Sequence, residues 1–350
     1  MKNWQKLKQK PDLWRQFFIR EQVLDGIRSF FKHQNFHEVE TPLLVASPGT
    51  EPYLDLFTTD ITFQTPSGDK KKQLYLLTSP ELAMKKLVAA GLPKIFQLCK
   101  SFRNNEGLSS LHNPEFTILE WYRANADYTD IMNDCENLIK SLVKNICQSD
   151  ALPYQGKTYQ LAGSWPRITI KKAFLKYAQI DSETLLNRDL LMKTALKKGY
   201  RHAKNASWEE LYHQIFLNEI EPALATFYQP VFLCDYPLAL AALSRKKAND
   251  ERFAERFELY IGGIELANAF SELVDPTEQR QRATADIQQR QELSKDIFPI
   301  DEDYIQALES GLPPTGGIAL GVDRLIMLLA DVKSIQETLF FPIEEAIELE

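Results

Sequence analysis

Two carboxylates, Glu258 and Glu265, flank the Gly262-Gly263 pair in the C-terminal half of this 350-residue chain. The runs on either side, residues 257–261 and 264–273, have the composition of strands, so we expect two consecutive strands joined by a tight turn. Carboxylates on such strands can converge on one divalent cation, because Mg²⁺ commonly takes one or two carboxylates together with substrate phosphates. Two exposed strand carboxylates are the alternative that the spacing leaves open.

Arg103 stands between an apolar run and a polar loop that leads to His112-Asn113-Pro114-Glu115-Phe116. A guanidinium at the end of a strand suits a polyanion, because it binds phosphate or carboxylate through paired hydrogen bonds. An arginine in this setting is also commonly a solvated surface residue, and the local pattern does not decide between the two.

A glycine-rich segment over residues 316–321 runs into Val322-Asp323-Arg324 and an apolar helix expected over residues 325–329. We expect a turn over residues 316–324, in which the glycines let the backbone approach a flat ligand closely. Arg324 would lie in the first helical turn, where a cation opposes the helix dipole. A nearby anion would offset that cost, so this position favours an anion-binding site.

The elements that must position these residues are helices mixed with strands. Apolar residues at helical spacing predict helices from residue 14 to 34 and from 131 to 143, and a shorter helix begins at Pro80 and Glu81. Extended segments are expected at residues 37–42, 56–57, 61–63, 74–77, 96–102 and 116–122, with a turn at 66–69 and an antiparallel hairpin formed by the last two. This mixture predicts an α+β fold with helices around a largely antiparallel sheet.

Residues 148–230 are the least regular part, and we interpret them as an insertion or subdomain within a single domain spanning residues 1–350. The overall composition, 44% hydrophobic and 25% charged, is that of a folded globular protein. The net charge of −7 argues against a general nucleic-acid coat, because phosphate binding needs clustered positive charge. Without a long apolar run or a signal-peptide core, the chain is expected to be soluble and cytoplasmic. The four cysteines lack a C-x-x-C pair, which argues against a zinc site or a disulfide framework.

Together, the three chemical stretches resemble the motifs of the class II aminoacyl-tRNA synthetases, and within that class the lysyl-tRNA synthetases. Residues 37–42 resemble the first motif, residues 102–122 the second and residues 316–325 the third. The resemblance implies the catalytic core of this class, an antiparallel sheet flanked by helices. Because the first motif lies at the dimer interface in the class, it also implies a homodimer.

The resemblance implies an ATP-dependent reaction that forms an acyl-adenylate and pyrophosphate, with Mg²⁺ held by Glu258 and Glu265. Arg103 would bind the α-phosphate and the incoming carboxylate, and Arg324 would meet the γ-phosphate side. The other residues implied for the ATP site are Asn105, Glu106, Asn113, Phe116 stacked on adenine, Leu266, and Gly321 on the pocket floor.

The implied substrate is lysine or a close analogue, whose amino groups need acidic partners. In the Thr78-Ser79-Pro80-Glu81 stretch, Glu81 would meet the amino group. Glu120 and Tyr122 would line the side-chain pocket together, because residues two apart on a strand share a face. The other residues implied for this pocket are Ser79, Pro80, Asn268, Phe270, Glu272 and Ala319.

Too few residues precede the expected first helix for a five-stranded barrel, so we expect no N-terminal anticodon-binding domain and no anticodon recognition. A truncated form is known in the elongation factor P–lysine ligase family, which attaches (R)-β-lysine to a lysine side chain of elongation factor P. Residues 119–123, 263–268 and 318–324 resemble that family more closely than the tRNA enzymes. Ala319 is the most informative, because lysyl-tRNA synthetases typically have glycine there; neutral drift is the alternative.

The second motif usually reads Arg-x-Glu, whereas this chain reads Arg103-Asn104-Asn105-Glu106. Either Glu106 has shifted by one position in a lengthened loop, or Asn105 replaces the acid. A lysine-rich stretch could recruit an acidic protein partner, or it could be a solvated helix face. Its members are Lys193, Lys197, Lys198, Arg201 and Lys204.

Two rival functions remain open from the sequence. One is a stand-alone lysine-activating enzyme or truncated lysyl-tRNA synthetase with another acceptor. The other is a regulator that binds an amino acid without catalysis, which predicts loss of the phosphate-binding arginines or the metal-binding carboxylates. Those residues are all present, which disfavours the regulator.

Overall fold

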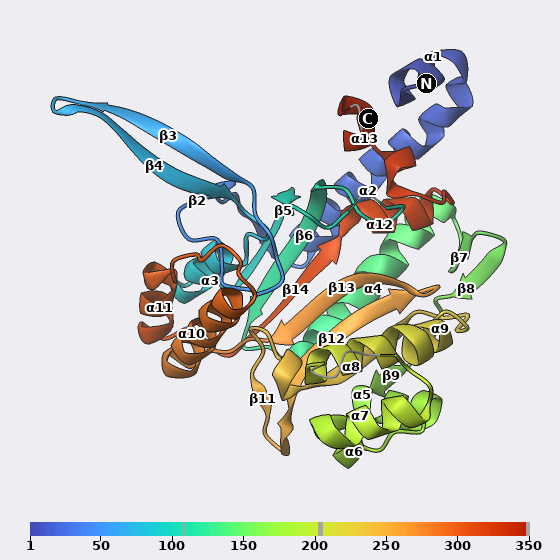
Figure 1. The fold of residues 1–350 in the computed structure, drawn as a ribbon. Helices are drawn as coiled ribbons and strands as arrows, with labels where there is room; N and C mark the ends of the chain where they lie inside the picture. The colour runs from blue at the N-terminus through green and yellow to red at the C-terminus, as the bar shows by residue number, and fades with distance from the viewer. Residues whose placement is uncertain (108, 202–205, 348–350) are drawn as a thin grey trace.

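The computed structural model describes residues 1–107, 109–201 and 206–347. Its centre is a large twisted sheet in the order β1-β5-β6-β14-β13-β12-β10-β9, with β11 paired to β12 (Figure 1). Neighbouring strands are antiparallel except at the two edges, where β1–β5 and β9–β10 are parallel. The strands are β1 (His37–Glu38), β5 (Lys94–Phe102), β6 (Glu115–Ala124), β9 (Arg167–Thr169), β10 (Val231–Pro237), β11 (Lys246–Lys247), β12 (Asp250–Ile261), β13 (Ile264–Ser271) and β14 (Thr315–Gly321). The predicted α+β class is confirmed.

Helices cover one face of this sheet, and others pack against part of the opposite face near β5 and β6 or lie beside β9 and β10 (Figure 1). The described helices are α1 (Asn3–Gln9), α2 (Trp14–His33), α3 (Glu81–Ala89), α4 (Tyr128–Cys147), α5 (Ile170–Ala173), α6 (Ser182–Leu186), α7 (Arg188–Lys197), α8 (Trp208–Ile215), α9 (Glu221–Leu224), α10 (Pro276–Glu292), α11 (Glu302–Glu309), α12 (Val322–Leu329) and α13 (Ile343–Ala346). Short 3₁₀ or π-helical turns lie at Pro11–Leu13, Phe174–Ala178, Phe216–Ile220, Leu238–Leu240 and Ile335–Thr338. None of the helices in the described part of the chain is long and apolar enough to cross a membrane.

The main core lies between the sheet and α2, α4 and α12. Val23, Ile27 and Phe31 recur at fourth positions along α2 and are fully buried, which is the spacing of one helix face. Trp121 of β6 and Ile318 of β14 meet this helical layer from the sheet. Since strand residues alternate between faces, their chain neighbours point to the opposite, open face.

The glycine-rich segment is a central strand, so the predicted turn over residues 316–324 is wrong. Residues Thr315–Gly321 form β14 between β6 and β13, and α12 begins at Val322. The glycines leave room for side chains that pack closely against both faces of this strand. A Cβ on Gly316 would lie 2.5 Å from Cγ1 of Ile131 in α4, and one on Gly317 would collide with Glu272 and Tyr122.

Most other predicted elements are confirmed. α2 spans the helix expected from residue 14, and β5 and β6 pair in register from Lys94↔Arg123 to Phe102↔Glu115. The strand expected at residues 56–57 is wrong, because β3 (Thr58–Thr65) begins after it. β3 pairs with β4 (Gly68–Leu76) in an arm that extends away from the sheet, with β2 (Leu44–Val45) at its base (Figure 1).

The segment between residues 148 and 230 is better ordered than its sequence indicated. It contains the hairpin of β7 (Ala151–Tyr154) and β8 (Lys157–Gln160), then β9 and the helices α5 to α9. Those helices enclose a second hydrophobic cluster, which includes Phe174 and Ile215. Of the lysine-rich stretch, Lys193 and Lys197 lie on α7 and Lys198 pairs with Glu219 at 2.8 Å. Lys204 lies outside the described residues.

Candidate active site

The open face of the sheet carries the polar residues that the sequence singled out. On β6, Leu119 and Trp121 enter the core, whereas Glu120 and Tyr122 point to the opposite face. Register then aligns Glu120 with Ala319 on β14, and Ala319 with Asn268 on β13. Three neighbouring strands therefore place three of the predicted pocket residues, Glu120, Ala319 and Asn268, in one row.

A cavity of about 220 Å³ opens at one end of this row. Its lining comes from the end of β5, the following loop, β6, β13, β14 and α12. The predicted residues on its wall are Arg103, Glu106, Asn113, Phe116, Glu265, Leu266, Asn268, Ala319, Gly321 and Arg324. A single cavity therefore brings together most of the residues expected at the nucleotide site.

Arg103 directly follows the last residue of β5, and its backbone N–H donates to the Pro114 carbonyl at 2.9 Å. Its guanidinium lies 5.2 Å from the centroid of the Phe116 ring and 3.3 Å from Oε1 of Glu106. Asn105 has a φ of +60°, and its amide donates instead to Asp55. Glu106 therefore lies on the cavity wall, whereas the Asn105 side chain points away from it. This geometry favours the interpretation in which Glu106 has shifted by one position in a lengthened loop.

Arg324 lies in the first turn of α12, as predicted, where its hydrogen bonds go to neutral groups and its nearest carboxylate oxygen is Oε2 of Glu265 at 3.9 Å. The guanidinium donates to the carbonyls of Glu265 at 2.8 Å and Leu111 at 3.3 Å, and it lies 3.0 Å from Nε2 of His112. Burial and the charge of Arg324 lower the pKa of His112, so the neutral imidazole can accept this hydrogen bond.

Asp323 fixes the start of α12 beneath the cavity. Its carboxylate accepts from the backbone N–H of Thr117 at 2.7 Å and pairs with Arg20 of α2. An acidic group at a helix N-terminus is favoured by the helix dipole. Asp323 therefore ties β6, α2 and α12 together and holds Phe116 and Arg324 in their relative places.

Glu258 and Glu265 lie on the adjacent strands β12 and β13. Glu258 pairs with Arg256 at 2.6 Å and accepts from the Tyr260 hydroxyl at 2.6 Å. Desolvation inside the cavity, where the Glu265 side chain remains 42% exposed, and then the charge of Glu258 raise the pKa of Glu265 to about 7. The two carboxylates therefore act on each other. Within the described residues no cluster of three or more protein ligands surrounds a metal position, and two carboxylates fit a cation that shares its shell with substrate phosphates.

The other end of the row is a buried acidic pocket. Glu120 accepts from the Ser79 hydroxyl at 2.6 Å and the Tyr122 hydroxyl at 2.9 Å. Burial, and then the charge of Glu81, raise the pKa of Glu120 to about 8. Pro80 caps α3, and the Glu81 backbone N–H donates to Ser79. The structure thus brings together five of the residues predicted for the substrate site: Ser79, Pro80, Glu81, Glu120 and Tyr122.

Glu272 follows β13 and closes the pocket against α3. Its Oε2 lies 2.5 Å from Nζ of Lys85, and the same ammonium lies 2.5 Å from Oε1 of Glu81. Asn268 and Phe270, on the same strand, both contact Arg256: the Asn268 side-chain oxygen accepts from it at 3.1 Å and the Phe270 ring lies 5.9 Å away. The acidic pocket and the carboxylate pair are therefore connected along β13.

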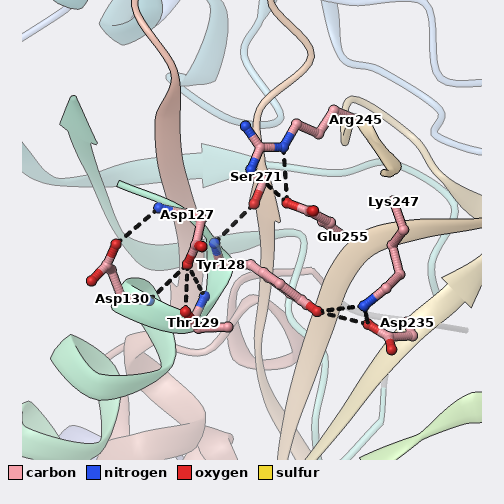
Figure 2. Close-up of polar contacts among 9 residues, drawn as sticks. All are labelled: Asp127, Tyr128, Thr129, Asp130, Asp235, Arg245, Lys247, Glu255 and Ser271. Carbon is pink, nitrogen blue, oxygen red and sulfur yellow. Dashed lines mark hydrogen bonds and ion pairs between the residues drawn. The ribbon is translucent and has the colours of Figure 1, made fainter. Parts of the chain in front are cut away.

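A polar network lies behind Glu272, where β13 ends. Figure 2 shows the Ser271 hydroxyl accepting from the Tyr128 backbone N–H at 2.9 Å, beside the pair formed by Arg245 and Glu255. The Tyr128 hydroxyl and the Lys247 ammonium both reach Asp235. This network anchors the end of β13 to the N-terminus of α4 and so fixes the position of the following Glu272.

A loop over residues 48–57 runs past the outer side of the row. The buried Arg290 guanidinium donates to the Glu51 carbonyl at 2.7 Å and the Leu54 carbonyl at 2.9 Å. The Asn104 backbone N–H bonds the Asp55 carbonyl beside Arg103. Burial, and then Glu81, raise the pKa of Glu51 to about 7, and Arg103 opposes the shift. Glu51 therefore lies within electrostatic range of both Glu81 and Arg103.

Sequence reasoning missed Lys85, Arg256, Arg20, Asp323 and Glu51. Lys85 and Glu81 are four residues apart on a helix, a spacing at which side chains meet. Arg256 and Glu258 are two apart on a strand, which puts them on one face. The sequence therefore contained a local signal for Lys85 and another for Arg256. The contacts from Arg20 to Asp323 and from Arg290 to the Glu51 loop join distant segments and carry no local signal.

Comparison with known proteins identifies relatives of the whole chain. The family model described as "tRNA synthetases class II (D, K and N)" matches residues 2–345. The chain is 38% identical over 329 residues to the lysine–tRNA ligase of Magnetococcus marinus, covering 93% of this chain and 63% of that protein. It is 37% identical over 338 residues to the lysine–tRNA ligase of Pelotomaculum thermopropionicum, covering 95% and 64%. The chain thus spans slightly less than two thirds of the length of these relatives.

Proposed function

Because the chain belongs to the class II tRNA synthetases of the D, K and N group, we propose that it activates lysine or (R)-β-lysine with ATP and transfers the aminoacyl group to a lysine side chain of elongation factor P. The observation that carries the lysine assignment is Glu272. This residue is 1% exposed, and apart from the Lys85 ammonium beside Oε2 neither of its carboxylate oxygens has a hydrogen-bond donor among the described residues, so Oε1 has no partner at all. Such an oxygen is costly to leave unsatisfied, and a substrate ammonium would satisfy it.

In the proposed activation step, a carboxylate oxygen of the amino acid attacks the α-phosphorus of ATP. The bond to the bridging oxygen of the β-phosphate breaks, and pyrophosphate leaves. Arg103 would bind the α-phosphate and the attacking carboxylate, since its fork can serve two anions at once. Arg324 would exchange its carbonyl partners for the γ-phosphate side. Charge develops on phosphoryl oxygens, so fixed cations supply most of the catalysis.

The remaining nucleotide contacts follow from the lining of the cavity. Phe116 would stack on adenine, with Asn113, Glu106 and Leu266 around the nucleotide. Gly321 would leave room on the floor, because a Cβ there would meet nothing closer than 3.7 Å. Glu258 and Glu265 would hold Mg²⁺, which would neutralise phosphate charge. Asn105, predicted for this site, would act only through Asp55 and the loop.

The proposed amino-acid contacts divide between the two ends of the substrate. Glu81 would meet the amine nearest the reacting carboxylate, since it lies between Glu120 and the Glu51–Arg103 side of the site. Glu120, Tyr122 and Glu272 would surround the distal ammonium. Phe270 and Asn268 would line the aliphatic stem between them.

Transfer to elongation factor P is supported by Ala319 and by the segments that resemble the ligase family. Ala319 lies between Glu120 and Asn268 in register and on the cavity wall, so its methyl group narrows the site where substrate and nucleotide meet. In the proposed transfer, the neutral acceptor amine attacks the adenylate carbonyl carbon. The bond to the phosphate oxygen breaks, AMP leaves, the amine loses one proton, and an amide forms.

A second candidate acceptor is tRNA, because both relatives compared above are lysine–tRNA ligases. Adenylate formation would be identical, and the nucleophile would be a ribose hydroxyl instead of an amine. The two candidates therefore differ only in the acceptor.

The proposal includes a homodimer. Its support is the resemblance of residues 37–42 to a dimer motif, together with the position of β1 at an edge of the sheet. Leu43 and Leu44, which follow β1 in the chain, are exposed apolar residues. Light scattering coupled to size-exclusion chromatography should give twice the mass of the chain, and a monomer at micromolar concentration would contradict this part.

The test is pyrophosphate exchange with (R)-β-lysine and L-α-lysine, followed by intact-mass measurement of elongation factor P and by a tRNA-charging assay. We expect exchange with a lysine isomer and one lysyl-sized addition to elongation factor P. Exchange followed by tRNA charging alone would establish the second candidate. Absence of exchange with either isomer would contradict the proposed function.

A further inference from the structure

The acidic pocket contains a cation of its own. Lys85 has no exposed surface, and its Nζ lies 2.5 Å from both Oε1 of Glu81 and Oε2 of Glu272. The same ammonium lies 5.9 Å from the ring centroids of Tyr122 and Tyr304. Burying a lysine is costly unless it is paired, so this arrangement is a specific feature of the pocket.

The position of Lys85 links the two ends of the substrate pocket. Glu81 belongs to α3, and Glu272 follows β13, so a single ammonium bridges a helix and the sheet. Burial alone would lower the pKa of Lys85, but the Glu272 and Glu81 carboxylates raise it well above its ordinary value. Lys85 therefore stays charged throughout the physiological range.

The charges that face one another in this pocket can be counted. Glu81, Glu120 and Glu272 supply three carboxyl groups, and Lys85 supplies one ammonium. The facing phenols, Tyr122 and Tyr304, are neutral because burial raises their pKa values. With Glu81 and Glu272 ionised beside Lys85 the net charge is −1, and it becomes −2 when Glu120, whose pKa burial raises to about 8, ionises as well. Burial also raises the pKa of Glu272 to about 8, and the charge of Lys85 opposes that shift. A substrate bearing two ammonium groups would neutralise the fully ionised pocket.

Resting on the proposed function, we infer that Lys85 is a positioning residue: it holds Glu81 and Glu272 in place and makes the pocket complementary to a substrate with two ammonium groups. Each glutamate gives one oxygen to Lys85 and keeps the other for substrate. For Glu272 the oxygen kept for substrate is Oε1, because it is buried without a donor among the described residues. Lys85 itself does not contact the reacting atoms.

The test compares Lys85→Met with Lys86→Met in lysine-dependent pyrophosphate exchange. Lys86 is the matched control, because it is the next residue on α3 and pairs with Asp301 outside the pocket at 2.7 Å. We expect Lys85→Met to raise KM for lysine by about 100-fold, since it leaves two buried carboxylates unpaired. KM for ATP should stay unchanged, and Lys86→Met should leave both constants unchanged. A folded Lys85→Met protein with wild-type KM for lysine would overturn the inference.

A second experiment adds small molecules that replace the missing side chain of Lys85→Ala, and it tests whether the pocket requires the charge of Lys85 or only its volume. This experiment also remains available if the Lys85→Met protein fails to fold. n-Propylammonium should raise the Tm of Lys85→Ala and restore its exchange activity, whereas neutral 1-propanol should not. Wild-type protein with n-propylammonium is the control for binding at the substrate site. Equal effects of amine and alcohol, or no effect of either, would overturn the role of the charge. The Tm measurement does not depend on activity, so it can be made even if the wild-type protein activates no lysine. Failure of the proposed function is therefore distinguished from failure of the inference about Lys85.

Discussion

The two ends of the active site hold their charges in different ways. At the nucleotide end, Arg324 rests on backbone carbonyls and His112, and Arg103 makes a partly exposed contact with Glu106 at 3.3 Å. At the amine end, Lys85 is fully buried between two carboxylates at 2.5 Å. An incoming phosphate can replace carbonyl partners and long, partly exposed ion pairs at little cost, whereas short buried ion pairs are rigid and expensive to break. Under the proposed function, the buried ion pairs would preorganise selectivity at the amine end, and the loosely held Arg103 and Arg324 would be available to bind phosphate at the other end.

The largest effect is expected at the nucleotide end from Arg103→Ala. Loss of the cation that faces the developing phosphoryl charge should lower kcat for pyrophosphate exchange by about 10³-fold. Arg103→Lys keeps the charge but loses the fork, so it should recover only part of the rate. Equal rates for wild type and Arg103→Ala would show that this arginine is not the catalytic cation.

At the amine end, Glu272→Gln should raise KM for lysine by about 100-fold, because it keeps the shape and removes the charge that faces the substrate ammonium. KM for ATP should not change, which distinguishes this end from the nucleotide end. Glu292→Gln on the exposed side of α10 is the control and should match wild type. A rise in KM for ATP of the same size would contradict the division into two ends.

A smaller effect is expected where the two ends meet. Ala319→Gly removes one methyl group between Glu120 and Asn268 and should shift the ratio of kcat/KM for α-lysine over β-lysine upward by about tenfold, or about 1.4 kcal/mol, which lies within the range for a group of this size. Pyrophosphate exchange with both isomers measures the ratio. An unchanged ratio would mean that Ala319 does not select the isomer.

The smallest effect is a pH dependence. Burial and Glu81 raise the pKa of Glu120 to about 8, so this carboxyl group is largely protonated at neutral pH and becomes negative as pH rises through that value. Binding of the substrate ammonium is therefore favoured at higher pH, and KM for lysine should fall by roughly threefold between about pH 7.5 and pH 8.5. Glu120→Gln should reduce the dependence, and the remainder belongs to Glu272, whose pKa burial also raises to about 8. A KM for lysine that rises over this interval would contradict the assignment.

Local sequence patterns predicted the parts of the site whose geometry depends on neighbouring residues. The alternation on one strand placed Glu120 beside Tyr122, and the apolar pattern of residues 96–122 predicted the β5–β6 hairpin. β14 was misread as a turn because glycine favours turns in isolation, whereas here Gly316 and Gly317 admit Ile131, Tyr122 and Glu272 from distant segments. Lys85 was missed because a lysine on an amphipathic helix normally faces solvent.

The most direct test of the two-ended site is pyrophosphate exchange at saturating ATP with L-α-lysine, (R)-β-lysine and norleucine. Norleucine has the length of lysine but lacks the distal ammonium, so it leaves the carboxylates at the amine end without a partner. We predict strong exchange with at least one lysine isomer and none with norleucine. Comparable exchange with norleucine, or no exchange with any of the three, would contradict the account.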